Sequence, residues 1–515
     1  MCNSKNMNRV PIDEALEETK FGRFNFVLIL VSGFVIVNVC LELVGIGFVL
    51  PVINCDMDLS YKEKGILGAV GFLGIISSSH IWGFLADTIG RRKVIRPTLI
   101  AGYLVTVASS FAPNYTTLLF LRFLNGFLIS AGSATIFAYL GEFHCDKTRN
   151  RAIMSAGFIS AACALVFPFV AWAAINQTWS YEIPFLNIVY KPWRMYIMVI
   201  GLLGLVCGLI MCFLPESPKY LHSIGKEDQV LKILQRIHSI NTGKSRESFK
   251  IEAILPESME EVNKRIKNEI KGSVLEKLIK CMWNQTAPLF MREHRRNTAL
   301  TCVIQFWIFF TYHGLYVWFP HILNSVMEFT RTYPDINLDM CDILSTMENI
   351  RADDNECKQS LELSTYHHTF TLEVIFVSLY LGVGYFTGKV GRRPTLFLIL
   401  LLCGVCGIIS STVTKPIVAV YALQVWLVCG LGTTVLSSIT VDIFPTNLRA
   451  MAICISLMCG RIGSVSGTNV IGALLENHCQ AGLLTAGIAL VLSGFLAFFL
   501  PKTSKKPKKQ NENSA

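Results

Sequence analysis

The sequence predicts an all-α integral membrane protein in which twelve transmembrane helices form two six-helix repeats. Three observations predict this class. Only 16% of the 515 residues are charged, 52% are apolar and the mean hydropathy is +0.48, whereas soluble proteins carry about 25% charged residues. Apolar runs long enough to cross ~30 Å of hydrocarbon recur along the chain. Markers in the first half of the sequence also return in the second. This composition excludes a disordered chain and disfavours a soluble enzyme.

Twelve segments are apolar over a length that lets a helix cross a bilayer. Many are rich in Gly, Ala and Ser, which is typical of membrane helices whose backbones approach closely. They lie at about residues 25–50, 66–86, 94–112, 117–140, 152–175, 195–214, 298–320, 369–388, 395–413, 417–438, 450–473 and 481–500. The spans predict an N-terminal bundle over 25–214 and a C-terminal bundle over 298–500.

The basic residues predict how the chain is oriented. They gather after the even-numbered spans and in the tail, 501–515, whereas the loop at 321–368 carries nine acidic and three basic residues. The positive-inside rule then places residues 1–24, the linker 215–297 and the tail in the cytosol. The acidic loop faces the exterior or a vesicle lumen. We therefore interpret the net charge of +10 as a topology signal and expect no nucleic-acid partner.

The linker at 215–297 carries two apolar stripes at helical spacing, over 230–237 and 262–278. Such stripes predict short amphipathic helices under the membrane body. A mostly disordered linker is the alternative. Both the linker and the acidic loop are also candidate surfaces for protein partners.

Internal repeats indicate that the chain is duplicated. The segment GFLADTIGRR at 83–92 returns as GYFTGKVGRR at 384–393. An acidic residue stands seven positions before an arginine in both halves, as Glu142 before Arg149 and as Asp442 before Arg449. The same order and similar offsets predict two related six-span halves.

These motifs resemble those of the major facilitator superfamily. The evidence is the two six-span halves, the repeated Gly-Arg-Arg segment and the PESPK stretch at 215–219, and it points to the sugar-porter-like and organic-ion-like branch. Three stretches are similar to the synaptic vesicle glycoprotein 2 family: GRFN at 22–25, Glu42 followed by GFVLP at 47–51, and YHGLYVWFP at 312–320. The resemblance implies the major facilitator fold in a multi-pass protein of the plasma membrane or of an intracellular vesicle.

The resemblance also implies a transporter that moves a small organic solute by alternating access between its halves. The second hypothesis is a vesicle membrane protein that transports weakly or not at all and acts through protein partners. The sequence contains no P-loop, no Ser/His/Asp constellation and no metal motif, so we expect neither an enzyme nor a cofactor other than a coupling proton.

The charged turns are expected to form a cytosolic gate. Gly83 and Gly90 would permit close helix approach and a tight turn, and Asp87 would pair with a neighbouring arginine. In the second copy Gly388 replaces the acid, so that half of the gate is expected to be weaker. We expect an ion-pair network between the halves, formed by Gly83, Asp87, Gly90, Arg91, Arg92, Glu142, Arg149, Glu216, Arg392, Arg393, Asp442 and Arg449. Arginines that only set topology, or inert surface pairs, are the alternative.

Ionisable residues inside the spans are few, because a charge at mid-bilayer costs about 2.5–3.5 kcal/mol even on lenient scales. The resemblance implies that Glu42 in span 1 is a proton site and that Arg122 in span 4 is its partner. A static buried pair, with the protein acting as a uniporter, is the alternative. Further candidates for the substrate or proton site are Tyr312, His313, Tyr316 and Trp318 at the outer end of span 7, and Glu373 in span 8.

Two covalent features are expected on the outer side. Cys341 and Cys357 are candidates for a disulfide in an oxidising compartment, with two free thiols as the alternative. Asn176, in the sequon Asn-Gln-Thr after span 5, is the candidate glycosylation site.

Overall fold

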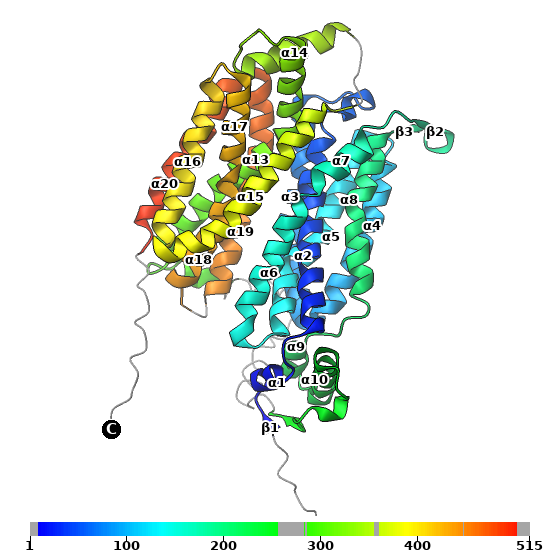
Figure 1. Cartoon of the computed structure of the whole chain (residues 1–515), viewed down its shortest axis with the longest axis vertical. Helices are drawn as coiled ribbons and strands as arrows, with labels where there is room; N and C mark the ends of the chain where they lie inside the picture. Colours follow the sequence, from blue (N-terminus) through cyan, green and yellow to red (C-terminus); the bar gives the residue numbers. More distant parts are fainter. Residues whose placement is uncertain (1–8, 256–282, 284–285, 355–359, 446–447, 502–515) are drawn as a thin grey trace, which may run out of the picture.

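The computed structural model describes residues 9–255, 283, 286–354, 360–445 and 448–501. Its helices form two elongated bundles that stand side by side, one from each half of the chain (Figure 1). The twelve predicted spans all correspond to helical segments, so the predicted all-α fold of two six-span halves is confirmed.

The N-terminal bundle contains the first six spans. Its helices are α2 (Arg23–Val44) with the 3₁₀ turns η1 (Gly45–Phe48) and η2 (Ile53–Cys55), α3 (Tyr61–Ile89), α4 (Arg91–Ser110), α5 (Tyr115–Glu142), α6 (Asp146–Ala164), α7 (Phe167–Ile175) and α8 (Pro192–Ile210). Between α7 and α8 the chain forms a small antiparallel hairpin of β2 (Tyr181–Ile183), η3 (Pro184–Leu186) and β3 (Ile188–Tyr190).

The C-terminal bundle contains the other six spans. Its helices are α13 (Arg295–Thr332), α14 (Met340–Asp354), α15 (Leu363–Lys389), α16 (Arg392–Thr412), α17 (Pro416–Leu427) with η6 (Val428–Leu431), α18 (Gly432–Ile443), α19 (Arg449–Asn477) and α20 (Cys479–Leu496) with η7 (Ala497–Phe499). Of these, α14 lies outside the predicted spans.

Local sequence signals account for the ends of these helices. Ser60 caps α3, and its side chain and that of Glu63 bond reciprocally to the backbone of the first turn. Gly90 and Gly391 separate the paired helices α3–α4 and α15–α16, with φ of 112° and 98°. Glycine adopts such positive φ values at little cost, so the repeated Gly-Arg-Arg motif forms the same tight turn in both halves.

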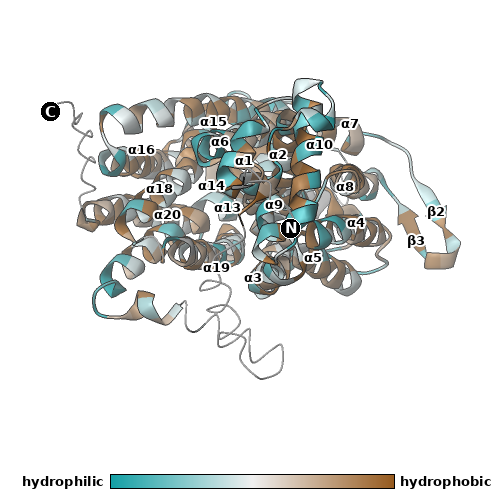
Figure 2. Ribbon diagram, turned by 90° about the horizontal axis from the view of Figure 1, so that it is seen from below, coloured by the Kyte–Doolittle hydropathy of each residue, from teal (hydrophilic) through white to brown (hydrophobic). Residues whose placement is uncertain are grey.

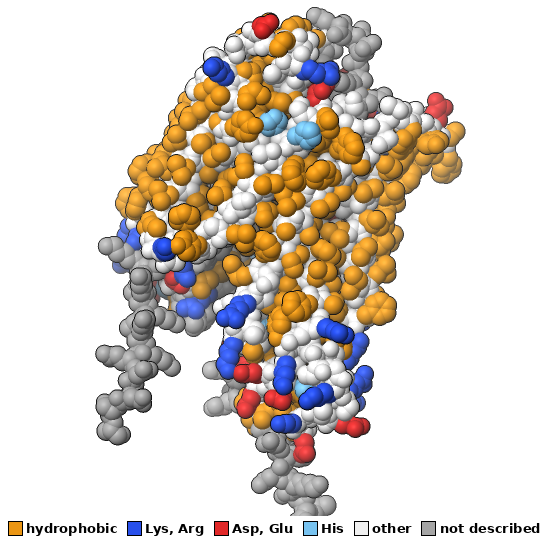
Figure 3. Space-filling view, viewed as in Figure 1, with side chains coloured by type: hydrophobic (Ala, Val, Ile, Leu, Met, Phe, Trp, Pro, Cys, Tyr) orange, Lys and Arg blue, Asp and Glu red, His pale blue; other side chains and the backbone are white. Residues whose placement is uncertain are grey.

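Eleven helical segments of the described chain are long and apolar enough to cross a membrane. The predicted third span, α4, is not among them, because its first turns carry Arg91, Arg92, Lys93 and Arg96. It nevertheless packs against α5 and α8 as a full member of the N-terminal bundle. Hydrophobic side chains cover the middle of the visible face, and charged side chains gather toward its ends (Figure 3). Seen from below, hydrophobic residues colour membrane helices such as α4 and α8, and hydrophilic residues colour the near end of α6 (Figure 2).

A small domain lies at the end of the N-terminal bundle where the described chain begins; we call this end the predicted cytosolic side. It contains β1 (Arg9–Val10), α1 (Ile12–Glu18), α9 (Pro218–Ser223), α10 (Glu227–Thr242), η4 (Arg246–Ser248) and β4 (Ala253–Ile254), and η5 (Ala287–Phe290) precedes α13. β1 pairs in parallel with β4, and the predicted apolar stripe 230–237 lies in α10, where Val230, Leu234 and Ile237 are buried. The second stripe, 262–278, lies outside the described residues.

The opposite end, the predicted exoplasmic side, differs from the expectation in two ways. The segment 321–368 is not a simple loop, because α13 continues to Thr332 and α14 follows it. The expected Cys341–Cys357 disulfide is wrong: Cys341 is bonded to Cys479 at the start of α20, with the two Cα atoms 5.6 Å apart. The reason is that α14 packs over the C-terminal bundle and brings Cys341 to α20. Cys357 lies outside the described residues.

The two bundles contact each other mainly along α3 and α19 and at the predicted exoplasmic side, where η1 packs on α13 and α7 on α15. The ribbons of the two bundles diverge toward the lower end in Figure 1, the predicted cytosolic side. At that end a side chain added at Gly83 or Gly388 would meet nothing within 4 Å. The expectation that Gly83 permits close helix approach is therefore wrong for this arrangement.

Candidate functional site

Glu42 and Arg122 form a buried ion pair inside the N-terminal bundle. Arg122 on α5 donates from Nη1 to Oε2 of Glu42 on α2 at 2.8 Å, and its Nη2 donates to the Glu42 backbone carbonyl. The side chains are 1% and 4% exposed. The structure thus brings together the two charges that the sequence had singled out.

The other Glu42 oxygen also has a partner. Thr106 on α4 donates to Oε1 at 2.6 Å, and Asn125 on α5 donates to Thr106 Oγ1 at 2.7 Å. Glu42 therefore belongs to a network of three helices of one bundle. Protonating its carboxylate would weaken the attraction that holds Arg122 in place.

Glu373 on α15 forms a second buried acidic group, in the C-terminal bundle. The Tyr316 hydroxyl on α13 donates to Glu373 Oε1, and the Tyr312 ring stacks on Phe376 one turn along α15. Cys40 of α2, in the other half, is within electrostatic reach of Glu373. Cys40 is exposed. These residues therefore face the region where the halves meet.

The aromatic run of span 7 lies in the middle of α13 rather than at its outer end, because α13 extends to Thr332. His313 bonds through Nδ1 to Ser464 Oγ on α19 at 2.8 Å, and its ring lies 5.0 Å from Phe72 of α3. Trp318 is fully buried and donates from Nε1 to the Thr468 carbonyl. The Trp318 ring also stacks on Tyr61 of α3, with centroids 5.6 Å apart, so it packs between the two halves with its indole donor already used.

A further charged residue within a span also lies between the two halves. Arg461 on α19 donates from Nη1 to Ser79 Oγ on α3, a direct hydrogen bond between the two halves. A charged residue within a span is a signal for function, but nothing in the sequence indicates which helix of the other half it faces.

The predicted cytosolic turns hold their charges within each half. In the N-terminal half, Arg91 pairs with Asp87 at 2.8 Å and with Glu142 at 3.0 Å, and the Arg92 backbone N–H donates to Glu216 at 3.0 Å. The Arg92 side chain donates to the carbonyls of Met211 and Cys212 at the end of span 6. Arg149 packs against Gly141.

In the C-terminal half, Arg392 pairs with Asp442, Arg393 donates to the Phe498 carbonyl and Arg449 donates to the Phe444 carbonyl. The expected network between the halves is therefore not formed. The physical reason is the divergence of the bundles at this end, which leaves each charged turn to pair with the closest groups of its own bundle.

Asn176 lies at the predicted exoplasmic end of α7, against the other half. Its Nδ2 donates to the Leu361 carbonyl at 2.9 Å, and its Oδ1 accepts from the Leu361 N–H at 3.1 Å and from the Tyr366 hydroxyl at 2.8 Å. The expected glycan acceptor is therefore a contact between the bundles in this structure.

A buried ion pair that the sequence analysis missed joins the start of α8 to the chain between η2 and α3. Arg194 at the start of α8 donates from Nη2 and Nε to Asp56 at 2.7 and 3.0 Å, and Lys191 lies 3.5 Å from the same carboxylate. The only available signal was the position of these residues at the edges of predicted spans, which normally indicates exposed side chains.

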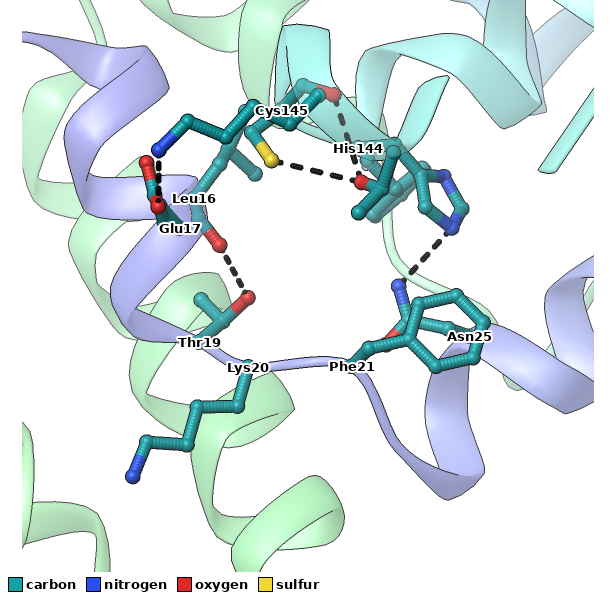
Figure 4. Close-up of a pocket in the computed structure, with 11 residues that line it drawn as sticks. Leu16, Glu17, Thr19, Lys20, Phe21, Asn25, His144 and Cys145 are labelled. Atoms are coloured by element: carbon teal, nitrogen blue, oxygen red, sulfur yellow. Dashed lines mark hydrogen bonds and ion pairs between the residues drawn. The ribbon is translucent and has the colours of Figure 1, made fainter. Parts of the chain in front are cut away.

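The described part of the chain has a cavity at each end of the molecule. One of about 550 Å³ opens at the predicted exoplasmic side between the halves, lined by Tyr61, Lys64 and His321 among others. The other, of about 110 Å³, lies beside α1 and the α5–α6 turn (Figure 4). The described residues contain no cluster of three or more side chains that could hold a metal ion.

The smaller cavity is bordered by a network that joins the first turn of α2 to the chain just after α5. Asn25 donates from Nδ2 to His144 Nε2 at 3.1 Å, and His144 donates from Nδ1 to the Leu140 carbonyl at 2.8 Å. Burial lowers the pKa of His144. Asn241 of α10 donates to Asn25 Oδ1 at 2.9 Å, so the same asparagine also holds the small domain.

Comparison with known proteins gives a consistent result. The family model described as the Major Facilitator Superfamily matches residues 27–341 and 362–515. Human synaptic vesicle glycoprotein 2B is 29% identical over 328 residues, which cover 61% of this chain and 47% of the relative. Rat synaptic vesicle glycoprotein 2A is 28% identical over 358 residues, 65% of this chain and 47% of the relative. The chain spans about half the length of these curated relatives.

Solved structures agree in fold. The partially occluded, inward-open xylose transporter XylE from E. coli superposes with a TM-score of 0.63 at 14% identity, covering 93% of this chain and all of that one. A bacterial homologue of the human lysosomal transporter Spinster, inward-facing and occupied, gives a TM-score of 0.59 at 12% identity, covering 93% of this chain and 97% of that one.

Proposed function

The chain belongs to the Major Facilitator Superfamily, and from this premise we propose that it moves a small organic solute across a membrane by alternating access. The observation that carries the proposal is the arrangement of the halves, which meet along α3–α19 and at one end of the molecule while the other end diverges. Two bundles that share one closed end can rock about the seam and expose a central site to either side in turn.

Within this mechanism, Glu42 is the proton site and Arg122 is its counter-charge. The pair is buried in one bundle, so protonating Glu42 would release the Arg122 guanidinium from one of its two acceptors on that residue. A proton would then change the packing of α2, α4 and α5, the three helices that the network joins. The proton enters from the more acidic compartment and leaves when the site faces the other.

The substrate would bind between the bundles, with residues from both. Tyr316 and Glu373 support this position, because they belong to the C-terminal half while the exposed Cys40 of α2 is within electrostatic reach of Glu373. The titles of the solved neighbours name xylose for one and a lysosomal transporter homologue for another. They support small-solute transport as a class and select no substrate.

Uptake into proteoliposomes tests the proposal. The purified chain would be offered radiolabelled sugars, organic cations and organic anions, with and without an inward proton gradient. Glu42→Gln should reduce gradient-driven accumulation of the solute tenfold or more. It should preserve the exchange of solute across membranes without a gradient. Glu182→Gln, in the exposed β2–β3 hairpin, is the matched control and should behave as the wild type.

The outcomes separate the two hypotheses of the sequence analysis. If solute accumulates equally with and without the gradient and Glu42→Gln leaves uptake unchanged, the chain is a uniporter and the proton site is wrong. If no solute moves at all, transport itself is wrong, and a protein that acts through partners becomes the better explanation.

A further inference from the structure

Asn176 forms a polar contact of three hydrogen bonds between the two bundles at the predicted exoplasmic side. Both hydrogen bonds to Leu361 involve its backbone, one to the carbonyl and one to the N–H, so the carboxamide pairs with the chain as a neighbouring strand would. The Tyr366 hydroxyl adds a third bond to the same Oδ1. Asn176 closes α7 of the N-terminal bundle, and Leu361 and Tyr366 stand at the start of α15.

Apolar packing surrounds these three bonds. Leu361 and Tyr366 are each 3% exposed and belong to a cluster that consists mainly of N-terminal-bundle residues. The Tyr366 ring stacks on Phe48 of η1 with centroids 6.0 Å apart and planes at 6°. Any motion that opens this end must withdraw both side chains from that cluster and break the three bonds of Asn176 at the same time.

The sequon gives this contact a second consequence. A glycan is attached to the side-chain nitrogen of asparagine, and Nδ2 of Asn176 lies 2.9 Å from the Leu361 carbonyl oxygen. A sugar on that nitrogen would have to occupy the place of Leu361. Glycosylation and the closed arrangement of this end therefore exclude each other.

We propose that Asn176 is the exoplasmic latch of the molecule and that it works as an unmodified asparagine, although it stands in a glycosylation sequon. The latch is made when the carboxamide bonds to Leu361 and Tyr366, and it is broken when the exoplasmic end opens. The proposal rests on the alternating access proposed above, to which it adds the residue that holds one end closed.

Hydrogen–deuterium exchange of the full chain in lipid nanodiscs tests the latch without requiring a substrate. Asn176→Ala should raise exchange severalfold in peptides over 45–50 and 361–366, the two sides of the contact, and leave α4 and α5 unchanged. Gln177→Ala is the matched control, because this neighbouring side chain bonds to the Ala173 carbonyl of α7, in its own half.

Two further variants make the result decisive. Thr178→Ala destroys the sequon and keeps the Asn176 carboxamide, so its exchange should equal that of the wild type. Tyr366→Phe removes one hydrogen bond and keeps the aromatic ring in place. It should raise exchange in the same peptides by a smaller factor than Asn176→Ala, and it remains informative if Asn176→Ala fails to fold. A glycosidase that removes N-glycans should not change the mass of the wild type.

Unchanged exchange in both Asn176→Ala and Tyr366→Phe would overturn the latch. A glycan on the wild type that Thr178→Ala removes would overturn the claim that Asn176 is unmodified. Neither result depends on uptake, so the latch can fail while transport stands. Conversely, a chain that moves no solute can still show the localised change in exchange.

Discussion

Glu42 and His144 are both buried in the N-terminal half, and their polar atoms find partners in different ways. Glu42 lies against the Arg122 guanidinium, the counter-charge that a buried carboxylate in a membrane helix needs if it is to be ionised. His144 is held as the neutral ring: Nδ1 donates to the Leu140 carbonyl, so Nε2 is the acceptor for Asn25. A second proton on Nε2 would face the Asn25 NH₂ group.

His144 is therefore expected to make stability depend on pH. Its folded-state pKa is lowered, chiefly by burial, so the unfolded chain binds the extra proton more readily than the folded chain does. The stabilisation is complete above the unfolded pKa of about 6.5 and is lost as the pH falls from there through the lower folded-state pKa. The temperature at the midpoint of thermal unfolding in nanodiscs should therefore decrease when the pH is lowered from 7 to 5.

The variant His144→Gln isolates this contribution. At pH 8 it should be less stable than the wild type by about 1 kcal/mol, because it weakens buried hydrogen bonds. At pH 5 the difference in stability between the two proteins should become smaller, because only the wild type has a buried histidine whose protonation destabilises the folded chain. A difference that stays constant from pH 8 to pH 5 would show that His144 does not titrate in this way.

Single residues also mark where the sequence was informative. Glu42 and Arg122 could be singled out because charges inside apolar spans are costly and rare, and their pairing was implied by the resemblance to the superfamily. The contact of Asn176 could not be anticipated, because a sequon after a span gives no sign of the residue it meets 185 positions later. The charged turns were expected to form ion pairs between the halves. Such pairs form only when that end of the molecule is closed, and the residue pattern does not show which end is closed.

At the scale of helices, close approach depends on which glycine faces a neighbour. A side chain at Gly126 of α5 would overlap the Gly71 carbonyl of α3, whereas one at Gly83 of α3 would meet nothing within 4 Å. Both stand in helices that the sequence predicts equally well. Only the packing of α3 on α5 distinguishes them.

This difference predicts opposite effects for the same substitution. Gly126→Ala should destabilise the chain by about 1–3 kcal/mol, because the added methyl group forces α3 and α5 apart. Gly83→Ala should be neutral or slightly stabilising, because alanine favours helix and has room there. Thermal unfolding of the two variants in the same nanodiscs measures both. Equal losses of stability would mean that α3 and α5 do not approach as described.

Helix ends were harder to anticipate than helix centres. Hydropathy averaged over about twenty residues finds a span, but it cannot detect a helix that leaves the bilayer and continues. The end of α13 is the clearest case, because Ile322, Val326 and Phe329 pack against Met340 and Ile343 of α14 beyond the expected boundary. The same packing carries Cys341 to α20, so an error in one helix end produced the error in the disulfide.

At the scale of the whole molecule, the distribution of charge predicts which end faces the cytosol. The charged turns, including Arg91, Arg92 and Arg392, lie at one end together with the small domain, and the β2–β3 hairpin lies at the other (Figure 1). Basic residues flanking spans are retained on the cytosolic side during insertion. The hairpin should therefore be external or lumenal.

An epitope placed after Phe185, which is 94% exposed at the tip of that hairpin, tests this orientation with little risk to the fold. In a plasma membrane, antibody should bind the hairpin epitope on intact cells, while a matched epitope before Arg9 should require permeabilisation. In a vesicle membrane, protease added from the cytosol should remove the N-terminal epitope and spare the hairpin. The reverse pattern would show that the chain has the opposite orientation in the membrane, and Asn176 would then hold the cytosolic end closed. In that orientation no glycan could reach Asn176, so the latch would stand without any competition from the sequon.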